Sequence, residues 1–126
     1  MKCIFLVEDN ADNADLICDI LADLFHIVHF RSAAPLLRGL RETTSPLPEL
    51  LLLDISLPDM DGIELLQAIR TLPDFGSIPA IAITAHAMND DRELLLRKGF
   101  NDYVSKPIVD EEKLLNAIYP LLPPQR

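Results

Sequence analysis

Four consecutive leucines that end on an aspartate constrain the fold of this chain more than any other stretch. The run Leu50–Leu53 holds no polar residue and stops at Asp54, and a turn-forming Ser-Leu-Pro follows at 56–58. An unbroken apolar run of this length is typical of a strand that is covered on both faces of a sheet. Because an ionised carboxylate is very costly to bury without a partner, we expect Asp54 where the strand leaves the core for a polar site.

Short runs of the same kind predict further strands, and the segments between them predict helices. The other expected strands are CIFLV (3–7), HIVHF (26–30), AIAI (80–83) and DYVS (102–105). Apolar residues recur at three- and four-residue steps at Ala14, Ile17, Leu21 and Leu24, at Leu65, Leu66, Ile69 and Leu72, and within 34–42, 92–99 and 110–122. Such spacing indicates amphipathic helices. Strand and helix alternate five times, which favours an α/β fold with a parallel sheet wrapped by helices, in one domain over 1–126.

Composition excludes several classes of function. The chain has 20 acidic and 11 basic residues, for a formal net charge of −9, so phosphate backbones and anionic membrane surfaces would repel it. Cys3 and Cys18 have no CxxC or Cys/His spacing that would suggest a metal cage. The apolar run at the N-terminus is too short for a signal sequence or a membrane span. We therefore expect a soluble, cytoplasmic protein that binds neither nucleic acid nor membrane.

Polar residues follow the expected strands at their carboxyl ends. Glu8 and Asp9 follow the first strand, Asp54 ends the third, Thr84 follows the fourth and Lys106 follows the fifth. The carboxyl ends of parallel strands meet at one edge of a sheet, where ligands bind in open α/β folds. The sequence therefore predicts one site built from residues that lie far apart along the chain.

The charges of these residues suggest what the site binds. Three neighbouring carboxylates repel one another by about 4 kcal/mol per pair at an effective dielectric constant near 20, and Lys106 alone leaves a surplus of negative charge. A divalent cation with oxygen ligands cancels this surplus, and Mg²⁺ suits one or two carboxylates together with phosphate oxygens. The Thr84 hydroxyl and the Lys106 ammonium are suited to hold the other oxygens of a phosphoryl group. Phosphoryl transfer to Asp54 is the chemistry that this set predicts.

Four motifs resemble those of a response-regulator receiver domain, similar to the chemotaxis-type single-domain regulators. They are LVEDN (6–10), LLLDISLPDMDG (51–62), IPAIAITAHAM (78–88) and DYVSKPI (102–108). The resemblance spans nearly the whole chain. It implies a doubly wound, flavodoxin-like (βα)5 fold with a five-stranded parallel sheet in the order 2-1-3-4-5.

The resemblance also implies a role for each site residue. Asp54 would accept a phosphoryl group from a phosphohistidine on a sensor histidine kinase or histidine phosphotransfer protein. Mg²⁺ would be held directly by Asp9 and Asp54, through water by Glu8, and by the backbone carbonyl of Ser56. Lys106, placed by a cis bond to Pro107, would contact the phosphoryl group.

A switch is implied as well. Thr84 would move toward the phosphoryl oxygens and Tyr103 would follow it inward, which would rearrange the surface that a downstream protein target reads. We hypothesise that His86 affects the lifetime of the acyl phosphate. Of the three leucines Leu94–Leu96, one should be exposed, either as an ordinary surface residue or as a contact to a partner or a second copy of the chain.

Other classes of function fit the sequence less well. An aspartyl-phosphate-forming phosphatase of the haloacid-dehalogenase type has an acid two residues after its nucleophile, where this chain has Ser56. A flavin binder would need a hydroxyl- and glycine-rich phosphate loop after the first strand. A receiver used only for docking would not need the full set of site residues. LVEDN and ITAHAM also resemble receiver modules of hybrid kinases, although Met1 and the short tails favour an independent protein.

Overall fold

The computed structural model describes residues 2–42, 47–85, 89–108 and 110–122. Its centre is one parallel sheet in the strand order β2-β1-β3-β4-β5. The strands are β1 (Cys3–Val7), β2 (His26–Phe30), β3 (Leu50–Asp54), β4 (Ala80–Thr84) and β5 (Asp102–Ser105). The predicted α/β fold, the flavodoxin-like architecture and the strand order 2-1-3-4-5 are confirmed.

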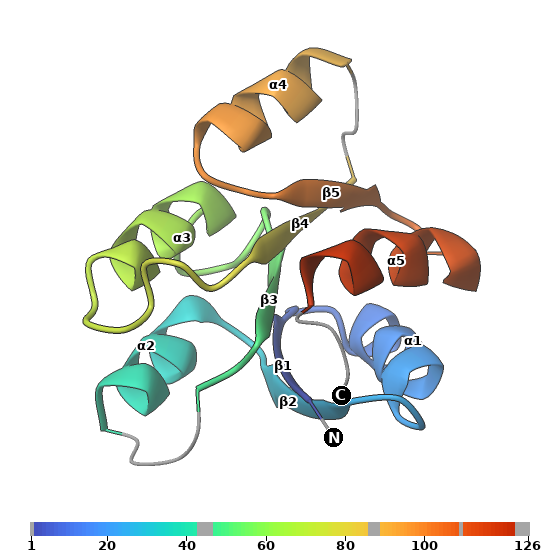
Figure 1. The fold of residues 1–126 in the computed structure, drawn as a ribbon, viewed down its shortest axis with the longest axis horizontal. Coiled ribbons are helices and arrows are strands. Elements are labelled where there is room, and N and C mark those ends of the chain that lie inside the picture. Colours follow the sequence, from blue (N-terminus) through green and yellow to red (C-terminus); the bar gives the residue numbers. More distant parts are fainter. Residues whose placement is uncertain (1, 43–46, 86–88, 109, 123–126) are drawn as a thin grey trace.

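Five α-helices surround the sheet. They are α1 (Ala11–Leu21), α2 (Ala33–Glu42), α3 (Gly62–Arg70), α4 (Asn89–Arg97) and α5 (Glu111–Ile118), and α5 continues into the 3₁₀ turn η1 (Tyr119–Leu121). Figure 1 shows α1 and α5 on one face of the sheet, α2 and α3 on the other, and α4 beside β5. Helices on both faces explain why the strand sequences do not alternate between apolar and polar residues.

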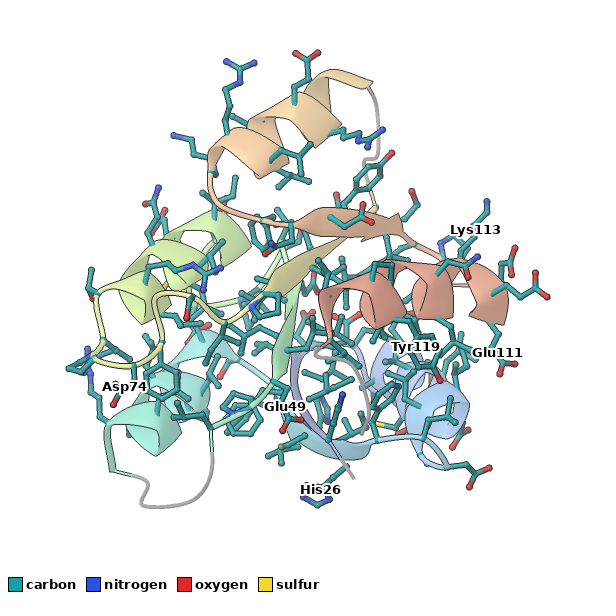
Figure 2. All side chains as sticks on the ribbon, viewed as in Figure 1. His26, Glu49, Asp74, Glu111, Lys113 and Tyr119 are labelled. Atoms are coloured by element: carbon teal, nitrogen blue, oxygen red, sulfur yellow. The ribbon has the colours of Figure 1, made fainter. Side chains whose placement is uncertain are left out.

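Successive residues of the central strands supply two separate cores. Leu50 and Leu52 of β3 pack into the core beneath α1 and α5, whereas Leu51 and Leu53 pack into the core beneath α2 and α3. All four side chains are fully buried. In contrast, charged side chains such as Glu111 and Lys113 of α5 reach outward (Figure 2).

Helix ends depart from the sequence expectation in three places. Leu24 lies beyond the end of α1 and is exposed. Helix α4 begins at Asn89 and ends at Arg97, whereas the apolar repeat predicted 92–99. Helix α5 ends at Ile118, well before residue 122, because Pro120 has no N–H to continue the α-helical hydrogen bonds and the chain tightens into η1.

Helix α4 exposes more apolar surface than expected. Leu94 and Leu96 are each 42% exposed, while Leu95 between them is buried in the core of the α2 and α3 face. The sequence predicts one exposed leucine among these three, and the structure exposes two. Over the described ranges of the chain, no helix has the length and apolar character needed to cross a membrane.

Candidate functional site

The predicted site residues converge at the carboxyl edge of the sheet. Asp54 and Thr84 are the last residues of β3 and β4, Glu8 directly follows β1, and Lys106 directly follows β5. Carboxylate oxygens of Glu8, Asp9 and Asp54 all lie within 4.8 Å of one another. The sequence prediction that these acids form one cluster is therefore confirmed in its geometry.

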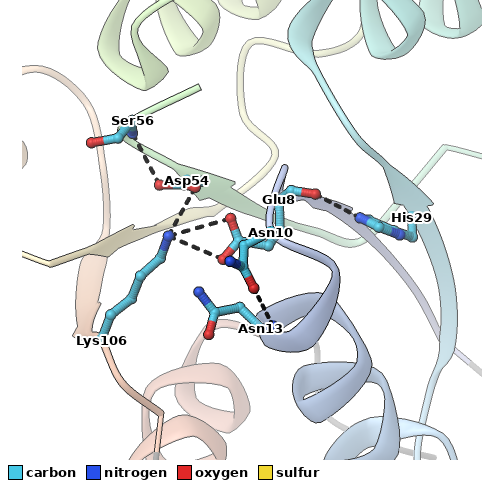
Figure 3. A network of polar contacts seen from close by, with 7 residues as sticks. All are labelled: Glu8, Asn10, Asn13, His29, Asp54, Ser56 and Lys106. Carbon is cyan, nitrogen blue, oxygen red and sulfur yellow. Dashed lines mark hydrogen bonds and ion pairs between the residues drawn. The ribbon is translucent and has the colours of Figure 1, made fainter. Parts of the chain in front are cut away.

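Lys106 lies between the two buried acids of this cluster. Its Nζ is 2.9 Å from Oδ2 of Asp54 and 3.0 Å from Oε1 of Glu8, and it donates a longer hydrogen bond of 3.3 Å to Oε2 of Glu8 (Figure 3). The peptide bond from Lys106 to Pro107 is cis, as the resemblance implies. One lysine thus partly neutralises two carboxylates that come from different strands.

Burial and pairing set the charge states of these groups. Glu8 is 0% exposed and Asp54 is 1% exposed. Burial, together with a hydrogen bond to Asp54, raises the pKa of Glu8 to about 7, although Lys106 opposes this rise. Burial alone would also raise the pKa of Asp54, but hydrogen bonds from Glu8, Lys106 and the Ser56 amide outweigh it and hold that pKa below its ordinary value.

The pKa of Lys106 is raised for the complementary reason. Burial alone would lower it, but the hydrogen bonds to Asp54 and Glu8 outweigh burial. At neutral pH the site therefore contains an ionised Asp54, a charged Lys106 and a glutamic acid close to its titration point. A proton on Glu8 reduces the repulsion between Glu8 and Asp54, which Lys106 alone does not fully neutralise.

The backbone of Glu8 is held by the neighbouring strand β2. The N–H of Glu8 donates to the carbonyl of Phe30 at 3.0 Å, and Nε2 of His29 donates to the carbonyl of Glu8 at 2.8 Å. The sequence predicts only an ordinary strand residue at His29, because the contact depends on the register that pairs Leu6 with His29. An imidazole on the edge strand thus helps to position the acidic pair.

The loop after Asp54 folds back tightly on the strand. The N–H of Ser56 donates to Oδ1 of Asp54 at 2.9 Å, and the N–H of Gly62 donates to the carbonyl of Ile55 at 2.9 Å. A Cβ atom on Gly62 would lie 2.4 Å from the backbone oxygen of Asp54, so only glycine fits at the start of α3. This close approach fixes the backbone immediately behind the Asp54 carboxylate.

Thr84 lies at the carboxyl end of β4, and Tyr103 lies on β5 opposite Ala82. Thr84 is buried at the end of β4, and its carbonyl accepts a hydrogen bond of 2.8 Å from the N–H of Lys106. Tyr103 is half-buried on β5 and packs against the core of the α2 and α3 face. His86 and Met88, which follow Thr84 in the motif at 78–88, lie outside the described residues.

The acidic cluster has the donor set of a site for a hard divalent cation. Oε1 of Glu8 is buried and contacts Nζ of Lys106 without the geometry of a hydrogen bond, so it retains lone pairs that its protein neighbours do not use. Asp9 is exposed at the rim and leaves one side of the cluster accessible. Oxygen donors of this kind fit Mg²⁺ or Mn²⁺.

The sheet order and its acidic carboxyl edge define a flavodoxin-like α/β protein of the receiver type. A family model described as the response regulator receiver domain matches residues 4–119. The chain belongs to this family.

Relatives of this chain occur alone and as parts of longer proteins. It is 43% identical to an uncharacterised 14.6 kDa protein of Leptolyngbya boryana, over 91% of this chain and 86% of that one. It is 36% identical to the polar-differentiation response regulator DivK of Brucella ovis, over 85% of each chain. It is 39% identical to the signal transduction histidine-protein kinase BarA of Escherichia coli K12, over 91% of this chain but only 12% of BarA.

Solved structures share the fold. The receiver domain of the sensor histidine kinase PA1611 from Pseudomonas aeruginosa, with a magnesium ion coordinated in its active-site cleft, superimposes with a TM-score of 0.78. It is 31% identical, and the match covers 91% of this chain and 92% of that one. The chemotaxis protein CheY4 of Vibrio cholerae superimposes with a TM-score of 0.85 at 18% identity, over 97% and 99% of the two chains, which supports the fold alone.

Proposed function

We propose that this chain is a response regulator of a two-component phosphorelay and that Asp54 is its phosphoacceptor. The observation that carries the proposal is the setting of the Asp54 carboxylate. Oδ2 contacts the Lys106 ammonium at 2.9 Å, Oδ1 accepts the Ser56 amide at 2.9 Å, and the two other acids of the cluster lie beside it. A low pKa keeps this carboxylate ionised and nucleophilic at neutral pH.

In the proposed reaction, an oxygen of Asp54 forms a bond to the phosphorus of a phosphohistidine on a kinase or phosphotransfer protein. The phosphorus–nitrogen bond breaks, and the imidazole nitrogen of the partner leaves with the electron pair. The Lys106 ammonium, already close to Asp54, stabilises negative charge on the transferred group. The protein thus supplies an aligned nucleophile and charge stabilisation, while the partner supplies an activated donor.

Mg²⁺ is the proposed cofactor. Asp9, Asp54 and the carbonyl of Ser56 would hold it directly, and Glu8 would bind it through water. When bound, the ion neutralises charge on the phosphoryl oxygens. The pKa of Glu8 near 7 suits this arrangement, because Glu8 needs little free energy to lose its proton when a cation arrives.

Thr84 and Tyr103 are the proposed switch residues. Thr84 ends β4, where it pairs with Ser105 of β5, and Tyr103 lies two residues earlier on β5, opposite Ala82. A phosphoryl group on Asp54 offers the Thr84 hydroxyl a new acceptor, and Tyr103 then follows inward. The surface of β5 and its neighbouring helices would change, and a downstream protein would read that change.

We further propose an independent, cytoplasmic, single-domain protein over residues 1–126. The relatives that it covers for most of their length, such as DivK, support this arrangement. BarA supports the alternative, in which the same sequence is a receiver module of a hybrid kinase. In either case the output passes to another protein, with phosphorylation-dependent dimerisation as an open alternative.

Intact mass spectrometry tests the proposed phosphoacceptor. The purified chain is incubated with acetyl phosphate and Mg²⁺, alongside Asp54→Ala and the control Asp74→Asn, which alters an exposed acid in the loop after α3. We expect one added phosphoryl group on the wild type and the control and none on Asp54→Ala. Modification of Asp54→Ala, or sustained hydrolysis of a free phosphoester by the wild type, would contradict the proposal.

A further inference from the structure

Asp59 joins the loop behind the site to the start of a helix that is distant in sequence. Its Oδ1 accepts the N–H of Ala33 and its Oδ2 accepts the N–H of Ala34, both at 3.0 Å. Helices α1, α3 and α5 instead begin on side chains that directly precede them, namely Asn10, Asp61 and Asp110. Helix α2 therefore receives its cap from a loop that lies 25 residues further along the chain.

The sequence of α2 makes this cap effective. The first N–H groups of any α-helix have no partner within the helix. Pro35 has no N–H, so Ala33 and Ala34 carry the free donors among the first three residues of α2, and Asp59 binds both. These hydrogen bonds hold the pKa of Asp59 below its ordinary value, so its carboxylate is ionised at neutral pH.

The loop that Asp59 anchors carries a proposed metal ligand. Ser56 donates its N–H to Asp54 and forms an isolated antiparallel bridge with Asp61, which closes the base of the turn. Asp59 lies between these two residues, near the tip of the turn. Because both of its oxygens are bound, the carboxylate resists rotation as well as translation, and the tip of the turn is fixed relative to α2.

We infer that Asp59 is a positioning residue for the metal site, which it serves by holding the turn 55–61, and with it the Ser56 carbonyl proposed as a ligand, in one place. This inference rests on the proposed function. Mg²⁺ demands nearly ideal octahedral geometry and short, well-aligned ligands. Groups that orient metal ligands typically change the affinity by about 10- to 100-fold when they are removed. Since Asp59 orients one ligand among several, we expect its loss to weaken Mg²⁺ binding by about tenfold.

A purely structural role for Asp59 is the rival explanation, and Gly39 allows the two to be separated. Gly39 lies within α2, and a Cβ there would meet Phe30 at 3.7 Å, which is an ordinary contact. Gly39→Ala therefore stabilises α2 without touching the turn. In the double variant Asp59→Ala/Gly39→Ala, helix stability is regained while the turn stays unanchored.

The experiment measures Mg²⁺ dissociation constants by titration calorimetry, at a temperature well below the unfolding midpoint, and metal-free stability by urea unfolding. The proteins are the wild type, Asp59→Ala, the double variant and Glu64→Gln, which removes an exposed charge at the start of α3. We expect about tenfold weaker binding in Asp59→Ala and in the double variant, and less than about twofold in Glu64→Gln. Asp59→Asn, which keeps one acceptor oxygen, should give an intermediate value.

Two results would overturn the inference. One is an Asp59→Ala variant that binds Mg²⁺ as tightly as the wild type. The other is a double variant whose affinity returns together with its stability, because Asp59 would then act only by capping α2. If the wild type itself does not bind Mg²⁺, the proposed cofactor and the inference fall together, whereas tight wild-type binding with an unaffected Asp59→Ala variant removes the inference alone.

Discussion

Strand β3 places two chemically opposite environments next to each other. Leu50–Leu53 form the interior of the sheet, and Asp54 begins its polar rim, which also contains Glu8 and Lys106. Burial does not distinguish the two regions, since Leu53 is 0% exposed and Asp54 is 1% exposed. What differs is how the side chains depend on their neighbours. Each leucine packs against many apolar atoms, whereas each rim group depends on one or two charges.

This difference predicts different responses to substitution. In the interior, a side chain of similar volume replaces another at small cost, because dispersion and burial are not directional. At the rim, the removal of one charge leaves another buried charge without a partner, and its removal together with the partner restores the balance. Three measurements test the contrast.

The largest effect is expected from Leu52→Ala in the interior. Leu52 is fully buried beneath α1 and α5, and the truncation leaves a cavity that the surrounding strands cannot close. We expect the free energy of unfolding to fall by about 3 to 4 kcal/mol. Urea unfolding measures this loss, with Leu52→Met as the volume-conserving control at less than about 1.5 kcal/mol. A loss below about 1 kcal/mol in Leu52→Ala would mean that the interior is loosely packed.

A smaller but more diagnostic effect is expected at Lys106. Lys106→Met leaves Glu8 and Asp54 facing each other without a cation. In EDTA at pH 8, we expect the free energy of unfolding to fall by about 3 kcal/mol. Asp54→Asn leaves a single acid with the lysine and should change stability by less than about 1 kcal/mol. The double variant Lys106→Met/Asp54→Asn should regain much of the lost stability, because Glu8 then has no second carboxylate to repel it. Additive effects of the two changes would show that the rim charges are independent.

The smallest effect is the pH dependence that Glu8 imparts. Its pKa is about 7 in the folded chain and near 4.5 in the unfolded chain, so the folded state binds more protons between these values. The stability that this proton provides is fully present below pH 4.5 and is lost as the pH rises through about 7. In EDTA, the wild type should therefore lose stability relative to Glu8→Gln from pH 5 to pH 8. Parallel stability curves for the two proteins would contradict the raised pKa.

The sequence was sufficient to predict the strands and the helices between them. Each apolar run became a strand, because a segment buried on both faces needs only apolar side chains and its composition reveals it. The ends of α4 and α5 were less predictable. Gly99, with a φ of +108°, lies two residues beyond the end of α4, and Pro120 breaks the last helix although apolar residues continue past it.

The residues that form the site could be predicted from the sequence, but several of the contacts that hold them in place could not. Strand topology alone brings Glu8, Asp54, Thr84 and Lys106 to one edge, so their convergence follows from the order of the strands. The hydrogen bond from His29 to Glu8 and the cap that Asp59 provides for α2 depend on register and loop conformation. Neither produces a periodic pattern in the sequence. The roles of the site residues in phosphoryl transfer stay predictions until the mass measurement is made.

The ammonium between the two buried acids has a consequence for how the protein is made. Together with a proton on Glu8, Lys106 balances the charge of Glu8 and Asp54 from within the chain itself. A newly synthesised polypeptide can therefore complete this end of the sheet before it meets any dissolved ion. Under the proposed function, folding and metal binding are then separate events, and a shortage of Mg²⁺ would leave a folded protein without its ion rather than a misfolded one.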